Sequence, residues 1–228
     1  MPFSILVVCT ANICRSPTTM RALRAGLADA GVSPDLVVVE SAGVAAADGL
    51  PMCELADTMT SAALGQPGEH RSRRLTADVA RRADLILVAD RGHRTGVVQL
   101  APATRSRTFT IRQAAQLATW VVGPDGTLEV AALKAAGTVP DLPPEDLRLG
   151  VPPLPATPDT RLAWLVSELD AARGLPPIDD ELTVAGWDVD DIGDPHVQGW
   201  DLHEPAVAVG LAASADLVLA LRAALTMP

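Results

Sequence analysis

The segment Ile5-Leu-Val-Val-Cys-Thr-Ala-Asn-Ile-Cys-Arg-Ser-Pro17 joins an apolar strand to a helix through a short polar loop. Phe3–Val8 is mostly apolar and rich in β-branched residues, which predicts a buried strand. Ser16-Pro17 pairs an N-cap residue type with proline at the first helical position, which predicts a helix from about Pro17 to Ala30. In such a turn the loop N–H groups and the positive helix end converge on one anion. The segment therefore predicts an anion-binding loop.

Cys9 and Arg15, at the start and the end of this loop, are the side chains best placed to meet the anion. Inward N–H groups, a helix N-terminus and a guanidinium favour a thiolate, which is a nucleophile. Arg15 offers paired donors for phosphate oxygens, and Ser16 can hydrogen-bond the sulfur. The alternative is a small core cysteine beside a surface arginine. The preceding strand, the helix start and Asn12 favour attack on phosphorus through a phosphocysteine intermediate.

The stretch Val8-Cys-Thr-Ala-Asn-Ile-Cys-Arg-Ser-Pro17 resembles the signature loop of the low-molecular-weight protein tyrosine phosphatases, although the family usually has glycine where Ala11 stands. The resemblance covers roughly residues 3–121 and 161–225. It implies a three-layer α/β/α fold with a four-stranded parallel sheet in the flavodoxin-like order 2-1-3-4, the phosphotyrosine protein phosphatase I-like fold. It also implies that phosphate is bound by Thr10, Ala11, Asn12, Ile13, Cys14, Arg15 and Ser16.

The family also carries a hydrogen-bond network that supports this loop. Its members are the loop asparagine, the serine after the loop arginine, the serine of a Ser-Ala-Gly element and a histidine. By position these are Asn12, Ser16, Ser41 and His70. Such a network would hold Asn12 in a left-handed conformation.

Asp194-Pro195 lies in an acidic stretch ahead of the last predicted helix, at about 206–224. An acid fixed by a following proline is a candidate general acid, because a leaving phenolate needs a proton and the attacking water must then lose one. The pair resembles the family's second signature, which assigns this role to Asp194. Asp90 matches an acid that supports the family's site, whereas His93 is interpreted as a surface residue.

The expected substrate walls depart from the family pattern. Aromatic residues usually follow the Asp-Pro pair and sandwich the phosphotyrosine ring, but His196 and Val197 stand here. The second wall position, six residues past the serine of Ser-Ala-Gly, is Ala47. Trp187, Trp200 and the proline-rich stretch at about 122–160 are candidates to replace these walls, and sequence alone does not place them.

Two further loop residues bear on specificity and redox chemistry. Family members that act on phosphoarginine carry threonine where Ile13 stands, so Ile13 favours phosphotyrosine or another aryl phosphate. Cys14 shares the loop with Cys9, and some family members protect an oxidised nucleophile by a disulfide there. Cys14 is therefore a candidate redox partner of Cys9.

Strands alternate with helices along most of the chain, with further strands expected at about 35–40, 84–89 and 107–111. This alternation predicts a parallel sheet covered by helices on both faces. The stretch at about 122–160 is rich in proline and interrupts the pattern, with one helix expected near 128–136. It is interpreted as an insertion, a loop-rich excursion or partly mobile flap, in a single domain of 228 residues.

Composition limits the classes of partner. The net charge of −10 argues against nucleic acid and anionic membrane surfaces. Three cysteines form no disulfide framework, and neither a signal peptide nor a membrane-spanning stretch is expected, so a cytoplasmic enzyme is predicted. No Gly-x-Gly-x-x-Gly follows a strand. Neither a cofactor nor a metal ion is expected. The expected partner is a phosphorylated protein or a small aryl phosphate. The sequence leaves the oligomeric state open between a monomer and a weak dimer.

Two other functions remain as alternatives. Arsenate mimics phosphate, so an arsenate reductase can share this fold, but that chemistry needs resolving cysteines and none follows Cys53. The missing aromatic walls also leave open a weakly active protein that binds phosphorylated partners.

Overall fold

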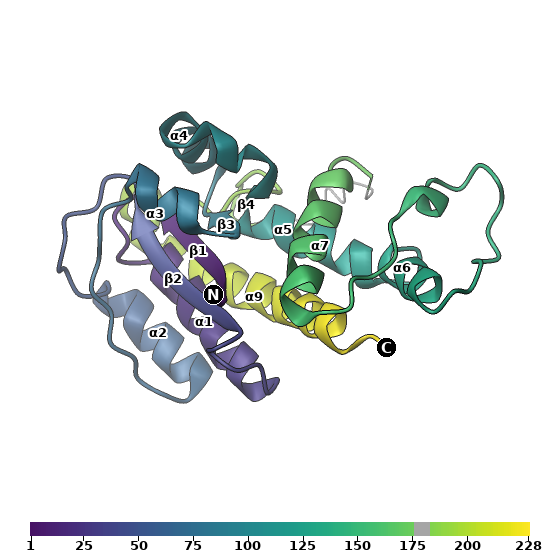
Figure 1. Ribbon diagram of the computed structural model, residues 1–228. Coiled ribbons are helices and arrows are strands. Elements are labelled where there is room, and N and C mark those ends of the chain that lie inside the picture. Colours follow the sequence, from purple (N-terminus) through teal and green to yellow (C-terminus); the bar gives the residue numbers. More distant parts are fainter. Residues whose placement is uncertain (176–182) are drawn as a thin grey trace.

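A four-stranded parallel sheet forms the centre of the computed structural model, which describes residues 1–175 and 183–228 (Figure 1). The strands are β1 Phe3–Cys9, β2 Val37–Gly43, β3 Leu85–Val88 and β4 Thr108–Thr110. Their order is β2-β1-β3-β4, which confirms the predicted fold class. Cys9 pairs with Gly43, and Val8 pairs with Val88. The carboxyl ends of the three strands therefore meet at one edge, where parallel sheets place their ligands.

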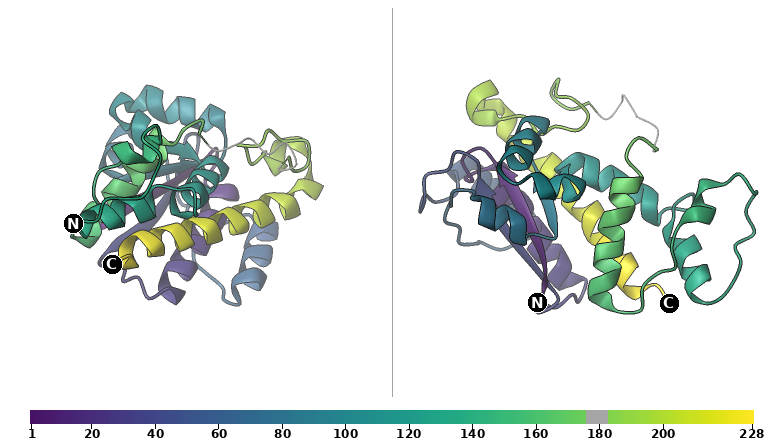
Figure 2. Two further views of the ribbon diagram at one scale, coloured as in Figure 1. Left: turned by 90° about the vertical axis from the view of Figure 1, so that its right-hand side faces the viewer. Right: turned by 45° about the horizontal axis from the view of Figure 1, so that its top comes forward.

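Helices cover both faces of the sheet, as Figures 1 and 2 show. One core cluster joins alternate β1 residues such as Ile5 and Val7 to α1, α5 and α9. The intervening Leu6 and Val8 face a second cluster with α3 and α4. A strand buried on both faces needs this nearly continuous apolar run. The helices are α1 Arg15–Asp29, α2 Glu54–Leu64, α3 Ala77–Arg82, α4 Arg91–Leu100, α5 Ile111–Val122 and α9 His203–Thr226.

Helix α1 begins earlier than the sequence predicted. Arg15 is its first residue and Cys14 its N-cap, and no side chain caps this end. Pro17 is tolerated because the N–H groups of the first turn lack partners inside the helix. Ser16 is therefore wrong as an N-cap, and its hydroxyl is directed into the loop instead.

The proline-rich stretch extends from the end of α5 and lies beyond α7 Pro158–Ala171 in Figure 1. It contains α6 Leu128–Ala135 and the short 3₁₀ helix Leu147–Gly150. Four of its buried side chains belong to the same cluster as the sheet, namely Leu128, Ala131, Val151 and Leu154. The segment is thus packed onto the main core and builds no core of its own. The last described elements before α9 are α8 Pro195–Gln198 and the 3₁₀ turn Trp200–Leu202.

One helical stretch among the described residues, Trp200–Thr226, is long and apolar enough to cross a membrane. This stretch contains Pro205, Asp216 and Arg222, so it does not contradict the expectation that no stretch of this length lacks charges and proline. Half of its most apolar window is buried inside the molecule, and α9 packs against α1 and α5. Contact with the protein core accounts for this apolar character.

Candidate active site

The predicted anion loop lies at the carboxyl end of β1 and leads directly into α1. Cys9 ends the strand and is 3 % exposed. Its Sγ lies 3.0 Å from the Ser16 hydroxyl, which belongs to the first turn of α1. The chain therefore curls back on itself within seven residues, and a hydroxyl proton is available to the sulfur.

Asn12 fixes the shape of this loop. Its φ is +57°, a left-handed conformation that asparagine adopts more readily than most residues. The fully buried side chain donates from Nδ2 to Ser16 Oγ and to Ser41 Oγ, both at 2.9 Å. Its Oδ1 accepts the Arg73 backbone N–H at 2.9 Å. These bonds hold the loop to the end of β2 and to the segment before α3.

His70 completes the network that the resemblance implied. Its Nε2 donates to the Asn12 backbone carbonyl at 2.6 Å. Burial lowers the pKa of His70, and the bond to the carbonyl opposes this only in part. The structure thus brings the four predicted supporting residues together. It adds the Arg73 N–H, which sequence reasoning missed because a backbone donor leaves no mark in the residue type.

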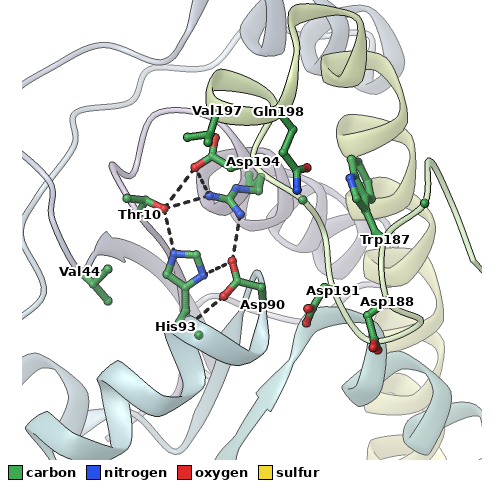
Figure 3. Close-up of a pocket in the computed structure, with 14 residues that line it drawn as sticks. Thr10, Val44, Asp90, His93, Trp187, Asp188, Asp191, Asp194, Val197 and Gln198 are labelled. Carbon is green, nitrogen blue, oxygen red and sulfur yellow. Dashed lines mark hydrogen bonds and ion pairs between the residues drawn. The ribbon is translucent and has the colours of Figure 1, made fainter.

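Arg15 connects the loop to distant parts of the chain, and its partners Asp90 and Asp194 are labelled in Figure 3. Its guanidinium is 4 % exposed. Nη2 donates to Asp194 Oδ2 at 2.6 Å and to Thr10 Oγ1 at 3.0 Å. Nη1 donates to Asp90 Oδ2 at 3.2 Å and to the Ile192 carbonyl at 3.0 Å. The predicted nucleophile loop and the predicted acid are therefore in direct contact across 179 residues of sequence.

The interpretation of His93 as a surface residue is wrong. Its side chain is 7 % exposed and is held between Thr10 and Asp90. Nε2 lies 3.0 Å from Thr10 Oγ1, and Nδ1 lies 2.8 Å from Asp90 Oδ2. The reason is local: Asp90 is the N-cap of α4, which directs the third residue of that helix back over the cap. The spacing Asp-x-x-His after a buried strand was the available signal.

The charge of Asp90 is stabilised by these contacts. Burial alone would raise the pKa of Asp90, but hydrogen bonds and charge from His93, together with Arg15, hold it at about 2. Asp90 is thus an anion that orients both Arg15 and His93, and the supporting acid implied by the resemblance lies beside the predicted site.

A cavity of about 570 Å³ opens over the loop. Thr10, Arg15 and Asp194 line it together with Val44 and Trp187, which come from the β2 side and from the segment before α8. Asp90, Asp188 and Asp191 also line the cavity, but Arg91 pairs with Asp188 at 2.6 Å and with Asp191 at 3.5 Å, and Asp90 pairs with Arg15. Its free surface is therefore less acidic than its composition suggests.

Of the residues at the family's wall positions, Ala47, His196 and Val197, one is among the described residues that line the cavity. Neither Ala47 nor His196 is among the described residues that line the cavity, and both are exposed. Val197 does line it, while Trp200 stacks on His203 outside it. Of the two tryptophans considered as replacements, the structure selects Trp187. Its position depends on the close approach of Gly193, where an added Cβ would overlap the indole.

A doubly covered parallel sheet with the predicted anion-binding loop between β1 and α1 is the arrangement of α/β proteins, a class in which ligands bind at the carboxyl ends of the strands and at helix N-termini. A family model described as low molecular weight phosphotyrosine protein phosphatase matches residues 4–120, and the chain belongs to this family.

Relatives in the family carry different names. The low molecular weight protein-tyrosine-phosphatase Etp of Escherichia coli K12 is 40 % identical over 111 residues, which are 48 % of this chain and 70 % of Etp. A protein-arginine-phosphatase of Geobacillus stearothermophilus is 35 % identical over 128 residues, or 56 % and 78 % of the two chains. The crystal structure of the Erwinia amylovora tyrosine phosphatase AmsI aligns with a TM-score of 0.55 at 24 % identity. That alignment covers 96 % of this chain and 93 % of AmsI, and it shows a shared fold.

Proposed function

We propose that this chain hydrolyses phosphotyrosine and related aryl phosphate monoesters in two steps, with Cys9 as nucleophile and Asp194 as general acid and base. The observation that carries the proposal is the contact of Arg15 with Asp194 at the mouth of the loop that contains Cys9. A nucleophile, an anion clamp and an acid are the groups that phosphoryl transfer to a thiolate requires.

In the first step the Cys9 thiolate attacks phosphorus. The S–P bond forms as the P–O bond to the aryl group breaks, and the Asp194 carboxyl gives its proton to the leaving oxygen. Loop N–H groups and Arg15 hold the equatorial oxygens. Arg15 Nη2 now binds Asp194 at 2.6 Å, so a phosphate that takes over this donor also frees Asp194.

In the second step the Asp194 carboxylate removes a proton from water, and the oxygen attacks phosphorus. The P–O bond forms as the S–P bond breaks, which returns the thiolate and releases phosphate. The Ser16 hydroxyl, 3.0 Å from Cys9 Sγ, donates to the departing sulfur. Thr10 lies 3.3 Å from Asp194 Oδ2 and helps to orient it.

The preference for an aryl group rests on Trp187 and Ile13. Trp187 provides the cavity with the aromatic surface that the residues at the family's two wall positions do not provide. Ile13 puts an apolar side chain in the loop, in line with the resemblance to the tyrosine-directed members. The arginine phosphatase among the relatives makes phosphoarginine the competing substrate.

The test compares a phosphotyrosine peptide, p-nitrophenyl phosphate and phosphoarginine as substrates. We expect turnover of the first two, none in Cys9→Ser, and a loss of about 10²- to 10⁴-fold in kcat for Asp194→Ala on the peptide. The loss is expected to be smaller on p-nitrophenyl phosphate, because its better leaving group needs less protonation. Asp188→Asn, an acid of the same cavity paired with Arg91, is the matched control.

Three results contradict parts of the proposal. Activity in Cys9→Ser would refute the nucleophile. Equal losses for Asp194→Ala on both aryl substrates would refute the general acid. Preferential turnover of phosphoarginine would refute the aryl substrate class alone. Tight binding of the phosphopeptide by wild type without turnover would support a binding protein instead.

A further inference from the structure

Four side chains with metal-binding chemistry gather behind the loop, outside the cavity described above. They are Cys14 at the N-cap of α1, Cys53 at the N-cap of α2, His196 in α8 and His203 at the start of α9. One ligand atom each from Cys14, His196 and His203 lies within 4.8 Å of the other two. Cys53 Sγ lies 3.5 Å from His203 Nε2.

These spacings suit a small tetrahedral ion. Zinc holds sulfur at about 2.3 Å and nitrogen at about 2.0 Å, so a tetrahedral angle places the two ligand atoms about 3.5 Å apart. The Cys53–His203 pair already has this separation. A simple S–H to nitrogen hydrogen bond would explain that one pair, but it does not explain why ligand atoms of Cys14 and His196 also lie within 4.8 Å of one of His203.

The imidazole of His203 is oriented as a metal ligand requires. Its side chain is completely buried, and Nδ1 donates to the Trp200 carbonyl at 2.9 Å. Since a carbonyl only accepts, Nδ1 carries a proton, and in the neutral imidazole the lone pair of Nε2 faces Cys53. A ligating histidine usually donates its other N–H in this way.

The remaining members are held by the same elements. Trp200 stacks on His203 with ring centroids 5.0 Å apart, and the His196 ring meets His203 edge-on at 4.8 Å. The Cys53 backbone N–H donates to the Ile13 carbonyl at 2.7 Å, which ties the start of α2 to the loop. Cys14 packs with Met52 and Val207 in a small apolar cluster. Cys14 and His203 are therefore buried, Cys53 is half-buried and His196 is exposed.

We propose that Cys14, Cys53, His196 and His203 bind one Zn²⁺ ion, in a site distinct from the phosphate loop's own anion site. Both thiols give up a proton to solvent and both imidazoles bind in their neutral form, so the bound ion is formally neutral and two protons are released. Two thiolates and two imidazoles are the ligands that zinc prefers over calcium or magnesium.

The position of the site gives it a consequence for the loop. Cys14 immediately precedes Arg15, and His196 lies two residues after Asp194. The ion would tie the start of α1 to the segment that contains the acid. It therefore restrains the relative position of Arg15 and Asp194, whose contact spans 2.6 Å.

The test uses the reduced, metal-free chain titrated with Zn²⁺ against a chromophoric chelator, and with Co²⁺ for its spectrum. We expect one site per chain, the visible bands of tetrahedral Co²⁺ and a thiolate-to-cobalt charge-transfer band. His196→Ala and Cys53→Ser are each expected to weaken Zn²⁺ binding by at least about 100-fold. His196 is exposed, so its replacement preserves the fold, and circular dichroism checks this.

Cys9→Ser is the matched control, because zinc can also bind the nucleophile. Binding retained in Cys9→Ser and lost in His196→Ala supports the site, and a Zn²⁺-dependent rise in Tm should follow the same pattern. Binding lost in Cys9→Ser but retained in His196→Ala would overturn it, as would no one-to-one binding by wild type. Hydrolysis of p-nitrophenyl phosphate without added Zn²⁺ is measured on the same samples, so failure of the zinc site and failure of the proposed hydrolysis are separate results.

Discussion

Replacing Asn12 with alanine or glycine separates its two contributions to the loop. Both variants lose the three side-chain hydrogen bonds to Ser16, Ser41 and the Arg73 N–H. Each bond contributes about 0.5–1.5 kcal/mol, and a buried group left unpaired costs about 1–3 kcal/mol. We therefore expect a loss of about 3–5 kcal/mol in the free energy of unfolding for Asn12→Gly.

Asn12→Ala should be less stable still, because alanine pays about 1–2 kcal/mol in the left-handed region that the φ of +57° requires. Glycine in turn lowers the free energy of unfolding by about 0.4–1 kcal/mol relative to alanine, because it increases the conformational entropy of the unfolded chain. The free energy of unfolding of Asn12→Gly is thus expected to exceed that of Asn12→Ala by about 1 kcal/mol.

The assay is urea unfolding at pH 7, followed by circular dichroism, with kcat/KM for p-nitrophenyl phosphate measured beside it. Ser41→Ala, which removes one of the three partners, should lose less stability than either Asn12 variant. An alanine variant as stable as the glycine variant would refute the argument that the left-handed backbone of the loop is a source of strain.

Further predictions concern the acid beside the loop and the cavity wall. The lowered pKa of Asp90, about 2, stabilises the fold above about pH 4, and this stability is lost as pH falls toward 2. Asp90→Asn should therefore be less stable than wild type by on the order of 1 kcal/mol at pH 6, by urea unfolding, allowing for the partial exposure of Asp90. This difference in stability should narrow as pH falls from about 4 toward 2. A gap that is constant with pH would contradict the ionic origin. Gly193→Ala should displace Trp187 and raise KM for aryl phosphates, whereas Gly150→Ala, with open space around it, should leave kinetics unchanged. An unchanged KM in Gly193→Ala would show that Trp187 does not contact the substrate. His93→Phe should lower kcat, measured on p-nitrophenyl phosphate, because it removes a partner of both Thr10 and Asp90.

Local sequence determined the elements that form the site. The apolar run before Cys9 predicted β1, and the alternation of strands with helices predicted a parallel sheet, because hydrophobic periodicity depends on near neighbours in the chain. The positions of Asn12, Ser16, Ser41 and His70 followed from a resemblance to a family. The structure places them within hydrogen-bond distance of one another, and their catalytic roles remain predictions.

Only the tertiary structure decided which distant side chains meet. Asp194 reaches Arg15 because the segment before α8 folds over the ends of the strands, and no local pattern encodes that path. The sequence misjudged His93 as a surface residue because its burial depends on the N-cap of α4. It did not place Trp187 because the position of that side chain depends on the close approach of Gly193.

The Cys/His cluster was likewise invisible in the sequence. A zinc motif is recognised by short ligand spacings, whereas here 38 residues separate Cys14 from Cys53 and 142 separate Cys53 from His196. The sequence by itself determined the loop and its chemistry, because they form within one strand, one turn and one helix. The tertiary structure alone decided what surrounds that loop, because burial and long-range contacts are properties of the packed chain.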